Sequence, residues 1–194
     1  KCYTIVKKEN RSKMSISELT GHTSWIRFES KNVYSNKNFQ RILDFYLFNC
    51  PVENTSVRSK TFNEYGWETK HFSVLSKKLR NASDSKIRFH RVPVNSIYDA
   101  LLSTNQLTKI NFDEETVIYH DSSNSMDTLF SAIRNAFAHG SYQLKTYNKT
   151  RYYCFENRQT GNKNYFDKEI RARIVLKEST LLNWIQIIES GNET

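Results

Sequence analysis

Three side chains in one short run, Arg134, Asn135 and His139, have the types needed to cleave RNA without a metal ion. In that reaction the RNA's own 2′-hydroxyl attacks the neighbouring phosphorus, so a catalyst must move protons and stabilise charge on the phosphoryl oxygens. Histidine titrates near neutral pH and can act as acid or base. Arginine stays charged, and its planar fork of donors matches phosphate oxygens. An asparagine amide can orient the histidine ring or the phosphate.

These residues lie on the strongest helical pattern in the chain, from Met126 to about Gly140. On a helical wheel of about 100° per residue, an apolar stripe is expected to face the core. The stripe consists of Met126, Leu129, Phe130, Ile133 and Phe137. Asn135 and His139 lie on roughly the opposite side, and Arg134 lies on the flank. We therefore expect a joint site to need a second helix, which can be the same helix of a second copy across a two-fold axis.

A purely structural explanation of the same residues stays open. His139 followed by Gly140 is an ordinary helix ending, because a cation suits the negative end of the helix dipole and glycine takes the left-handed cap. Arg134 can be a solvated flank residue, and Asn135 can be a buried polar residue bonded locally. Spacing alone favours this explanation over a catalytic one.

The string IRNAFAHG, from Ile133 to Gly140, resembles the R-x4-6-H motif of the HEPN superfamily. Asn135 matches the polar residue that commonly follows the arginine, and four residues separate Arg134 from His139. A hairpin, a strand and a final helix expected downstream extend the resemblance over about residues 120–190. The first 110 residues or so match no family pattern.

The resemblance implies a homodimer in which two motif helices face each other and form a composite site. Arg134 would hold the scissile phosphate, His139 would act as acid or base, and Asn135 would orient the pair. It further implies an endoribonuclease that needs no metal or cofactor and leaves a 2′,3′-cyclic phosphate, in a toxin–antitoxin or antiviral defence role. RNA and an antitoxin protein would be the partners. Some members are non-catalytic modules for nucleic-acid or nucleotide binding and dimerisation, so that alternative stays open.

The composition favours a mainly helical fold, because glycine and proline, at 5 and 2 of 194 residues, are too scarce for many tight turns. We expect a HEPN-like bundle of four or five helices with a small antiparallel hairpin inserted before the last helix. The expected helices span residues 39–49, 67–79, 95–105, 126–140 and 181–188. Strand-like runs cover 142–155 and 169–176 with a turn at 157–164, whereas 106–117 is ambiguous and 116–119 fits a strand.

The domain organisation expected from this pattern is a single HEPN-like domain over residues 1–194, with its motif-bearing part at 120–190. Residues 1–37 are polar and form a possible appendage with short strands at 3–6 and 25–28. The run His120-Asp121-Ser122 has the residue types of a hydrolase triad, but adjacency does not give triad geometry, so we interpret it as a polar turn. The basic, aromatic run 88–91 is interpreted as a solvated loop.

The charge balance favours a polyanionic partner, since 29 basic residues against 20 acidic ones give a net charge of +9. Basic and aromatic residues alternate just after the motif helix and could guide RNA to it. The candidates for RNA binding are Tyr142, Lys145, Lys149 and Arg151. The alternatives are a basic surface that only aids solubility, and a small sheet whose aromatic face packs on the helices.

The cysteines Cys2, Cys50 and Cys154 are odd in number and widely spaced, which predicts free thiols in a reducing compartment. No stretch is as long as a membrane span, and no signal peptide is visible. We therefore expect a cytoplasmic protein.

Overall fold

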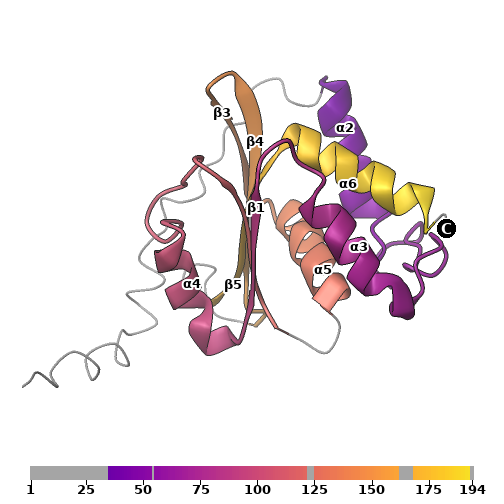
Figure 1. The fold of residues 1–194 in the computed structure, drawn as a ribbon, viewed down its shortest axis with the longest axis horizontal. Helices are drawn as coiled ribbons and strands as arrows, with labels where there is room; N and C mark the ends of the chain where they lie inside the picture. The colour runs from indigo at the N-terminus through magenta and orange to yellow at the C-terminus, as the bar shows by residue number, and fades with distance from the viewer. Residues whose placement is uncertain (1–34, 54, 122–124, 162–167, 193–194) are drawn as a thin grey trace, which may run out of the picture.

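The computed structural model describes residues 35–53, 55–121, 125–161 and 168–192, and these form a five-stranded mixed sheet. The sheet lies between two helical layers (Figure 1). The strands follow the spatial order β1 (Ile87–Val92), β2 (Glu115–His120), β5 (Ile170–Lys177), β4 (Thr150–Arg158) and β3 (Tyr142–Tyr147). β1 and β2 are parallel, and the other neighbouring pairs are antiparallel.

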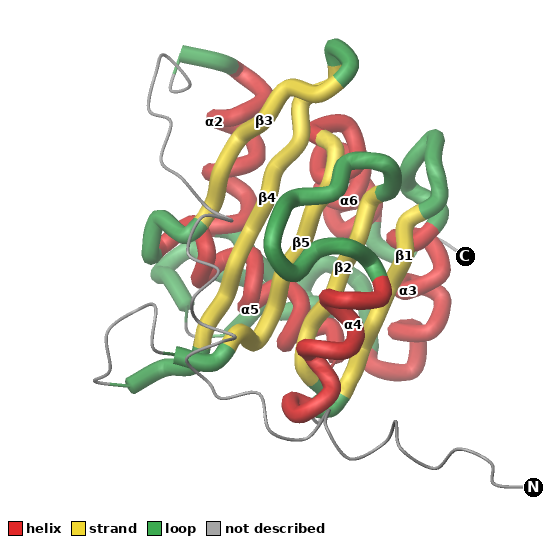
Figure 2. Tube along the Cα trace, turned by 90° about the vertical axis from the view of Figure 1, so that its left-hand side faces the viewer, coloured by secondary structure: helices red, strands yellow, loops and turns green. Residues whose placement is uncertain are grey.

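The helices are divided unequally between the two faces of the sheet. One face carries α2 (Lys37–Leu43), which continues into the π-helical turn η2 (Asp44–Phe48), together with α3 (Phe72–Arg80), α5 (Ser125–Ala138) and α6 (Glu178–Ser190). The short turn η3 (Thr69–His71) leads into α3. The opposite face carries α4 (Ile97–Ser103), which follows the turn η4 (Val94–Ser96) and lies in front of the sheet in Figure 2.

The main core lies between the sheet and the larger helical layer. Because side chains alternate along a strand, Tyr153 and Phe155 of β4 point into this core, while Tyr152 and Cys154 point toward the other face. Both faces of the sheet are covered, which explains why β5 is buried along nearly its whole length. Trp184 of α6 is fully buried in the main core, and its ring nitrogen donates a hydrogen bond to Leu79 of α3.

The prediction of a mainly helical bundle is wrong, because the described residues form an α/β fold around a five-stranded sheet. The run 142–155 is not one strand but the hairpin β3–β4. Asn148 and Lys149 at its tip have φ values of +48° and +64°, so the tight turn is made without glycine. The scarcity of glycine was therefore a misleading guide. The run 88–91, interpreted as a loop, lies in β1, and β2 extends the ambiguous strand at 116–119.

The predicted helices are largely confirmed. α5 and α6 contain the expected segments nearly whole, and α2 with η2 covers the segment that ends before Pro51. α4 lies inside the expected 95–105, whereas the α-helical part of 67–79 begins only at Phe72. The predicted strand at 169–176 is β5. The strands expected at 3–6 and 25–28 lie outside the described residues.

The described cysteines, Cys50 and Cys154, are free thiols and buried, whereas Cys2 lies outside the described residues. Burial raises the pKa of both thiols well above the ordinary value, so neither is a ready nucleophile.

None of the described helices combines the length and the apolar character that crossing a membrane would require.

Candidate functional site

The motif helix α5 is anchored by the apolar stripe that the sequence predicts. Met126, Leu129, Phe130, Ile133 and Phe137 are all buried. The ring of Phe137 meets the ring of Phe155 on β4 edge to face at 5.0 Å, and Phe130 stacks on Tyr46 of η2 at 6.0 Å. The stripe thus fixes the rotation of α5 between the sheet and η2, and this rotation decides where the polar motif residues point.

Arg134 is half-buried and held in place by two hydrogen bonds. Its Nη2 donates to the backbone oxygen of Thr55 at 2.8 Å, and its Nη1 donates to Oδ1 of Asn135 at 3.1 Å. Its Nε has no hydrogen-bond partner among the described residues. The guanidinium therefore has a defined orientation. Because Nε is buried, the donors left for a phosphate oxygen are the second hydrogens of Nη1 and Nη2.

His139 lies just beyond the last residue of α5 and is exposed. The helix ends there in a Schellman arrangement, in which the Gly140 N–H donates to Phe137 and the Ser141 N–H donates to Ala136, at 3.2 and 2.8 Å. Gly140 has a φ of +66°, which favours glycine at this position. The ordinary helix ending expected from His-Gly is thus present, and it projects the imidazole into solvent.

A pocket of about 620 Å³, which we call the strand-end pocket, lies between α5 and the ends of β2, β4 and β5. One wall is a stripe of α5 that includes Ser131 and Asn135. The other wall includes His120, Arg158 and Arg171. Asn135 therefore connects the motif to this pocket, because it both lines the pocket and accepts a hydrogen bond from Arg134.

Each of the two arginines that line the strand-end pocket is paired with a carboxylate, and Asp127 also lines the pocket. Arg158 is almost fully buried and pairs with Glu156, and Arg171 pairs with Glu169 at 3.0 Å. Burial lowers the pKa of His120, and the positive charge of Arg171 lowers it further, although a hydrogen bond with the Arg171 backbone and the charge of Asp121 act in the opposite direction. His120 is thus favoured in its neutral form by its surroundings.

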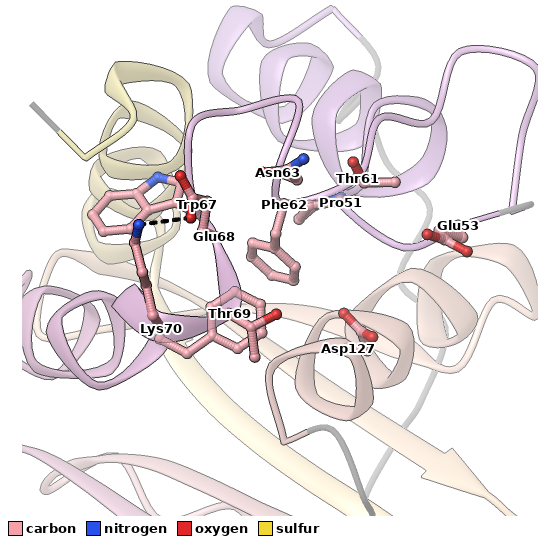
Figure 3. A pocket seen from close by; sticks show the side chains of 11 residues that line it. Pro51, Glu53, Thr61, Phe62, Asn63, Trp67, Glu68, Thr69, Lys70 and Asp127 are labelled. Atoms are coloured by element: carbon pink, nitrogen blue, oxygen red, sulfur yellow. Dashed lines mark ion pairs between the residues drawn. The ribbon is translucent and has the colours of Figure 1, made fainter.

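A second pocket, of about 670 Å³, lies on the other side of Asp127, and most of the charged residues that line it are acidic (Figure 3). Glu53 and Asp127 lie on one side of it, while Glu68 on the other side pairs with Lys70 at 2.9 Å. Burial raises the pKa of Asp127, and the nearby Glu53 raises it further. Three carboxylates against one lysine repel a phosphate, so this acidic pocket does not fit RNA.

The structure places the predicted RNA-binding residues on different surfaces. Tyr142 packs toward the helical layer, with its ring 4.8 Å from that of Phe137. Arg151 also faces this layer and pairs with Glu178 of α6 at 3.2 Å. Lys145 pairs in register with Tyr152, whose side chain points to the α4 face. Lys149 is exposed at the hairpin tip, roughly 20 Å from the start of β3 at about 3.3 Å per residue. The four residues do not form one binding surface.

Sequence reasoning missed the wall that His120 and the ends of β4 and β5 form in the strand-end pocket. His120 was interpreted as part of a polar turn, and Arg158 and Arg171 belong to segments separated by more than ten positions. Their convergence depends on the β4–β5 register, in which Arg158 pairs with Ile170. Glu156 and Arg173, each next to apolar residues of its strand, signal a buried ion pair, but that pair lies on the α4 face of the sheet and does not reveal the pocket.

Comparison of the chain with protein-family models, with curated proteins and with solved structures finds no match.

Proposed function

We propose that the chain is a metal-independent endoribonuclease of the HEPN type, with a composite site formed by two copies of the chain. The observation that carries this proposal is the arrangement at the end of α5. There the Arg134 guanidinium is bonded to Asn135 and to Thr55, and His139 is exposed about one helical turn further along. The string IRNAFAHG resembles the R-x4-6-H motif of the HEPN superfamily, and this resemblance connects the arrangement with RNA cleavage.

The proposed reaction uses the three motif residues in distinct roles. Arg134 binds the scissile phosphate and stabilises the charge on its oxygens, with Asn135 orienting the guanidinium. One His139 takes the proton of the 2′-hydroxyl, and the second His139 gives a proton to the leaving 5′-oxygen. The bond between the 2′-oxygen and phosphorus forms as the bond to the 5′-oxygen breaks. The products are a 2′,3′-cyclic phosphate and a 5′-hydroxyl.

The proposed dimer is compatible with the sheet-based fold. The buried stripe of α5 faces the sheet and η2, whereas Ala138 and His139 at its end are exposed. A second copy can therefore approach the end of α5 without displacing the core. The small side chain of Ala138 permits a close approach of two helices at this point. A two-fold axis there would bring two Arg134 and two His139 side chains to one phosphate.

From the resemblance alone, we extend the proposal to the protein's setting. The chain would act in the cytoplasm, in a toxin–antitoxin or antiviral defence system, with RNA as its substrate and an antitoxin protein as a further partner. The basic excess of +9 supports an RNA substrate, because it favours association with a polyanion.

The test is cleavage of structured and unstructured RNA by the purified protein in EDTA. The wild type is expected to cleave and to leave 2′,3′-cyclic phosphate ends, while Arg134→Ala and His139→Ala lose activity by about 100-fold or more, the scale of acid–base and charge-stabilising groups. His90→Ala, a half-buried histidine on β1, is the matched control and should cleave like the wild type. Full activity in either motif variant would refute the assignment.

A non-catalytic module for binding and dimerisation is the second candidate. It is favoured by the hydrogen bond from Arg134 to the backbone oxygen of Thr55. This hydrogen bond holds the 55–60 loop against α5, so it is a structural role for the arginine. This candidate predicts RNA binding or dimer formation by the wild type with no turnover in any buffer. It also predicts that the Arg134→Ala, His139→Ala double variant still binds.

A further inference from the structure

We propose that the pocket of about 670 Å³ beside Asp127, which we call the acidic pocket, binds an organic cation with a guanidinium head and an apolar stem (Figure 3). An arginine side chain has this chemistry. The proposal goes beyond RNA cleavage, because it uses neither Arg134 nor His139. It rests on two carboxylates that face each other, on an aromatic floor and on the size of the pocket.

Two carboxylates from different elements meet at one side of the acidic pocket. Glu53 lies in the loop after η2, and Asp127 lies in the first turn of α5. Burial raises the pKa of Asp127 and the charge of Glu53 raises it further, so the two carboxylates repel each other. Glu53 has no hydrogen bond or ion pair within the described part of the chain. A cation bound between the two carboxylates would replace this repulsion by attraction to both.

The far side of the acidic pocket is already neutralised by the protein itself. Glu68 lies there, and the Lys70 ammonium pairs with its carboxylate at 2.9 Å. The negative charge that no described cation balances therefore lies on the side of Glu53 and Asp127. A cationic head is expected to bind on that side. A guanidinium suits the position, because its five donors in one plane can bond to two carboxylates at once.

The floor of the acidic pocket is aromatic and firmly packed. Phe62 lies between Glu68 and Asp127 in Figure 3, and it is buried in the main core. Its ring packs edge to face on Phe72 at 5.2 Å and on Phe130 at 5.4 Å. A guanidinium is weakly hydrated and packs well on aromatic rings, and an apolar stem gains by leaving water. The floor therefore favours an organic cation over a metal ion.

The size of the acidic pocket leaves room for the stem as well as the head. Its volume of about 670 Å³ falls within the range of roughly 300–1,000 Å³ typical of small-molecule sites. Thr61, Asn63 and Thr69 add hydroxyl and amide groups to the lining, which can bond to polar atoms next to the stem. The shared chemistry is an alkyl guanidinium, which can come from a free small molecule or from an arginine of a partner protein.

The test is titration calorimetry with three probes: butylguanidinium, the capped tripeptide acetyl-Gly-Arg-Gly-amide, and butylurea, which has nearly the shape of butylguanidinium without its charge. The wild type is expected to bind at least one of the two cations saturably and butylurea about 10-fold or more weakly. Glu53→Gln keeps the size of an exposed side chain and removes its charge. It should weaken cation binding by about 10-fold or more, the scale of a lost charge-assisted hydrogen bond. Asp127→Asn should weaken it to a similar extent.

The matched control is Glu189→Gln, which removes the same charge from an exposed glutamate on α6. Glu189 pairs with Arg41 and is not among the described residues that line the acidic pocket. This variant should bind the cations within about 2-fold of the wild type. Tighter binding of butylguanidinium identifies a free small molecule as the source of the guanidinium, and tighter binding of the tripeptide identifies a protein partner. Either ranking supports the site.

Three results would overturn the proposal: no saturable binding of either cation by the folded wild type, binding of butylurea as tight as that of butylguanidinium, or an equal loss in Glu53→Gln and Glu189→Gln. Thermal unfolding of each variant shows whether it is folded. Failure of RNA cleavage and failure of the acidic pocket are distinguishable, because these titrations contain no RNA and the cleavage assay uses Arg134 and His139 variants.

Discussion

The Arg134 guanidinium donates a hydrogen bond of 3.1 Å to the side-chain oxygen of Asn135, its immediate neighbour on α5. Successive residues of a helix point about 100° apart, so this contact requires the arginine to bend around the helix toward the asparagine. Arg134 is thereby drawn from the flank of α5 toward the side that carries Asn135. The same asparagine lines the strand-end pocket, so one amide links the proposed catalytic group to that pocket.

We predict that Asn135→Ala impairs RNA cleavage far more than it affects folding. Without the amide, Arg134 loses one hydrogen bond and is no longer held in its orientation, so single-turnover cleavage should slow by about 10-fold or more. The free energy of unfolding should fall by only about 1 kcal/mol. Asn157→Ala removes another half-buried amide from the strand-end pocket and is the matched control. Wild-type cleavage by Asn135→Ala would rule out a positioning role for this residue.

The buried stripe of α5 makes a strong prediction for stability. Ile133 is fully buried in the main core, so Ile133→Ala should lower the free energy of unfolding by about 2–5 kcal/mol in urea denaturation. Val74→Ala, at a 42 % exposed position on α3, should change it by less than about 0.5 kcal/mol. If Ile133→Ala proved as mild as Val74→Ala, the packing of α5 against the sheet would have to be reconsidered.

Substitution of the buried Glu156 is expected to lower the free energy of unfolding strongly. It bonds to Arg158 and to Arg173 with almost no solvent exposure, so Glu156→Gln leaves two buried guanidinium groups without their counter-charge. We expect a loss of about 3–5 kcal/mol in chemical denaturation. Glu189→Gln, which breaks the exposed pair with Arg41, should cost no more than about 1 kcal/mol. Similar losses in the two variants would contradict the burial of the cluster.

The titration of His120 tests its burial and the position of Arg171 beside it in the strand-end pocket. Burial and the charge of Arg171 lower its pKa below the ordinary 6.5, so an NMR titration of the ring should give a midpoint under that value. Arg171→Gln should move the midpoint upward, because one of the two lowering influences is removed. A midpoint at or above 6.5 in the wild type, or no upward movement in the variant, would count against the proposed geometry.

The lowered pKa of His120 makes the stability of the fold depend on pH. A histidine whose pKa is lower in the folded state binds fewer protons there than in the unfolded chain. Stability is therefore expected to fall as the pH drops through about 6.5 toward the folded-state pKa. His120→Gln should remove part of this dependence in denaturation curves recorded between neutral and mildly acidic pH. Burial, and to a smaller extent Arg88, also lower the pKa of His90. His90 therefore adds to the same pH dependence of stability, and its contribution should remain in His120→Gln.

The sequence was sufficient to predict α5 because its apolar residues recur at helical spacing and all of them enter the core. It was insufficient for the sheet. β1 is an edge strand in which Ile87 and Phe89 face the main core while Arg88 and Arg91 stay near solvent, so its apolar content is low. The β3–β4 hairpin turns at Asn148 and Lys149, where positive φ values occur without glycine and leave little trace in the sequence.

The strand-end pocket could not be predicted for a different reason. Its wall combines the end of β2, the end of β4 and the start of β5, and these segments meet only because of the strand order and register. A one-residue change of register would bring other residues to this end of the sheet. Motif residues that share one helix, such as Arg134 and His139, are much easier to find than residues that tertiary pairing brings together.

The most direct test of the central claim, a composite cleavage site, is the activity of wild-type chains co-refolded with a large excess of His139→Ala chains. If one phosphate is cleaved by two histidines from two copies, almost every wild-type chain is then paired with an inactive one. RNA cleavage in EDTA per wild-type chain is expected to fall close to zero. Co-refolding with an excess of His90→Ala chains should leave it unchanged. Cleavage per wild-type chain that is undiminished by the His139→Ala excess, or absent from the wild type altogether, would contradict the composite site.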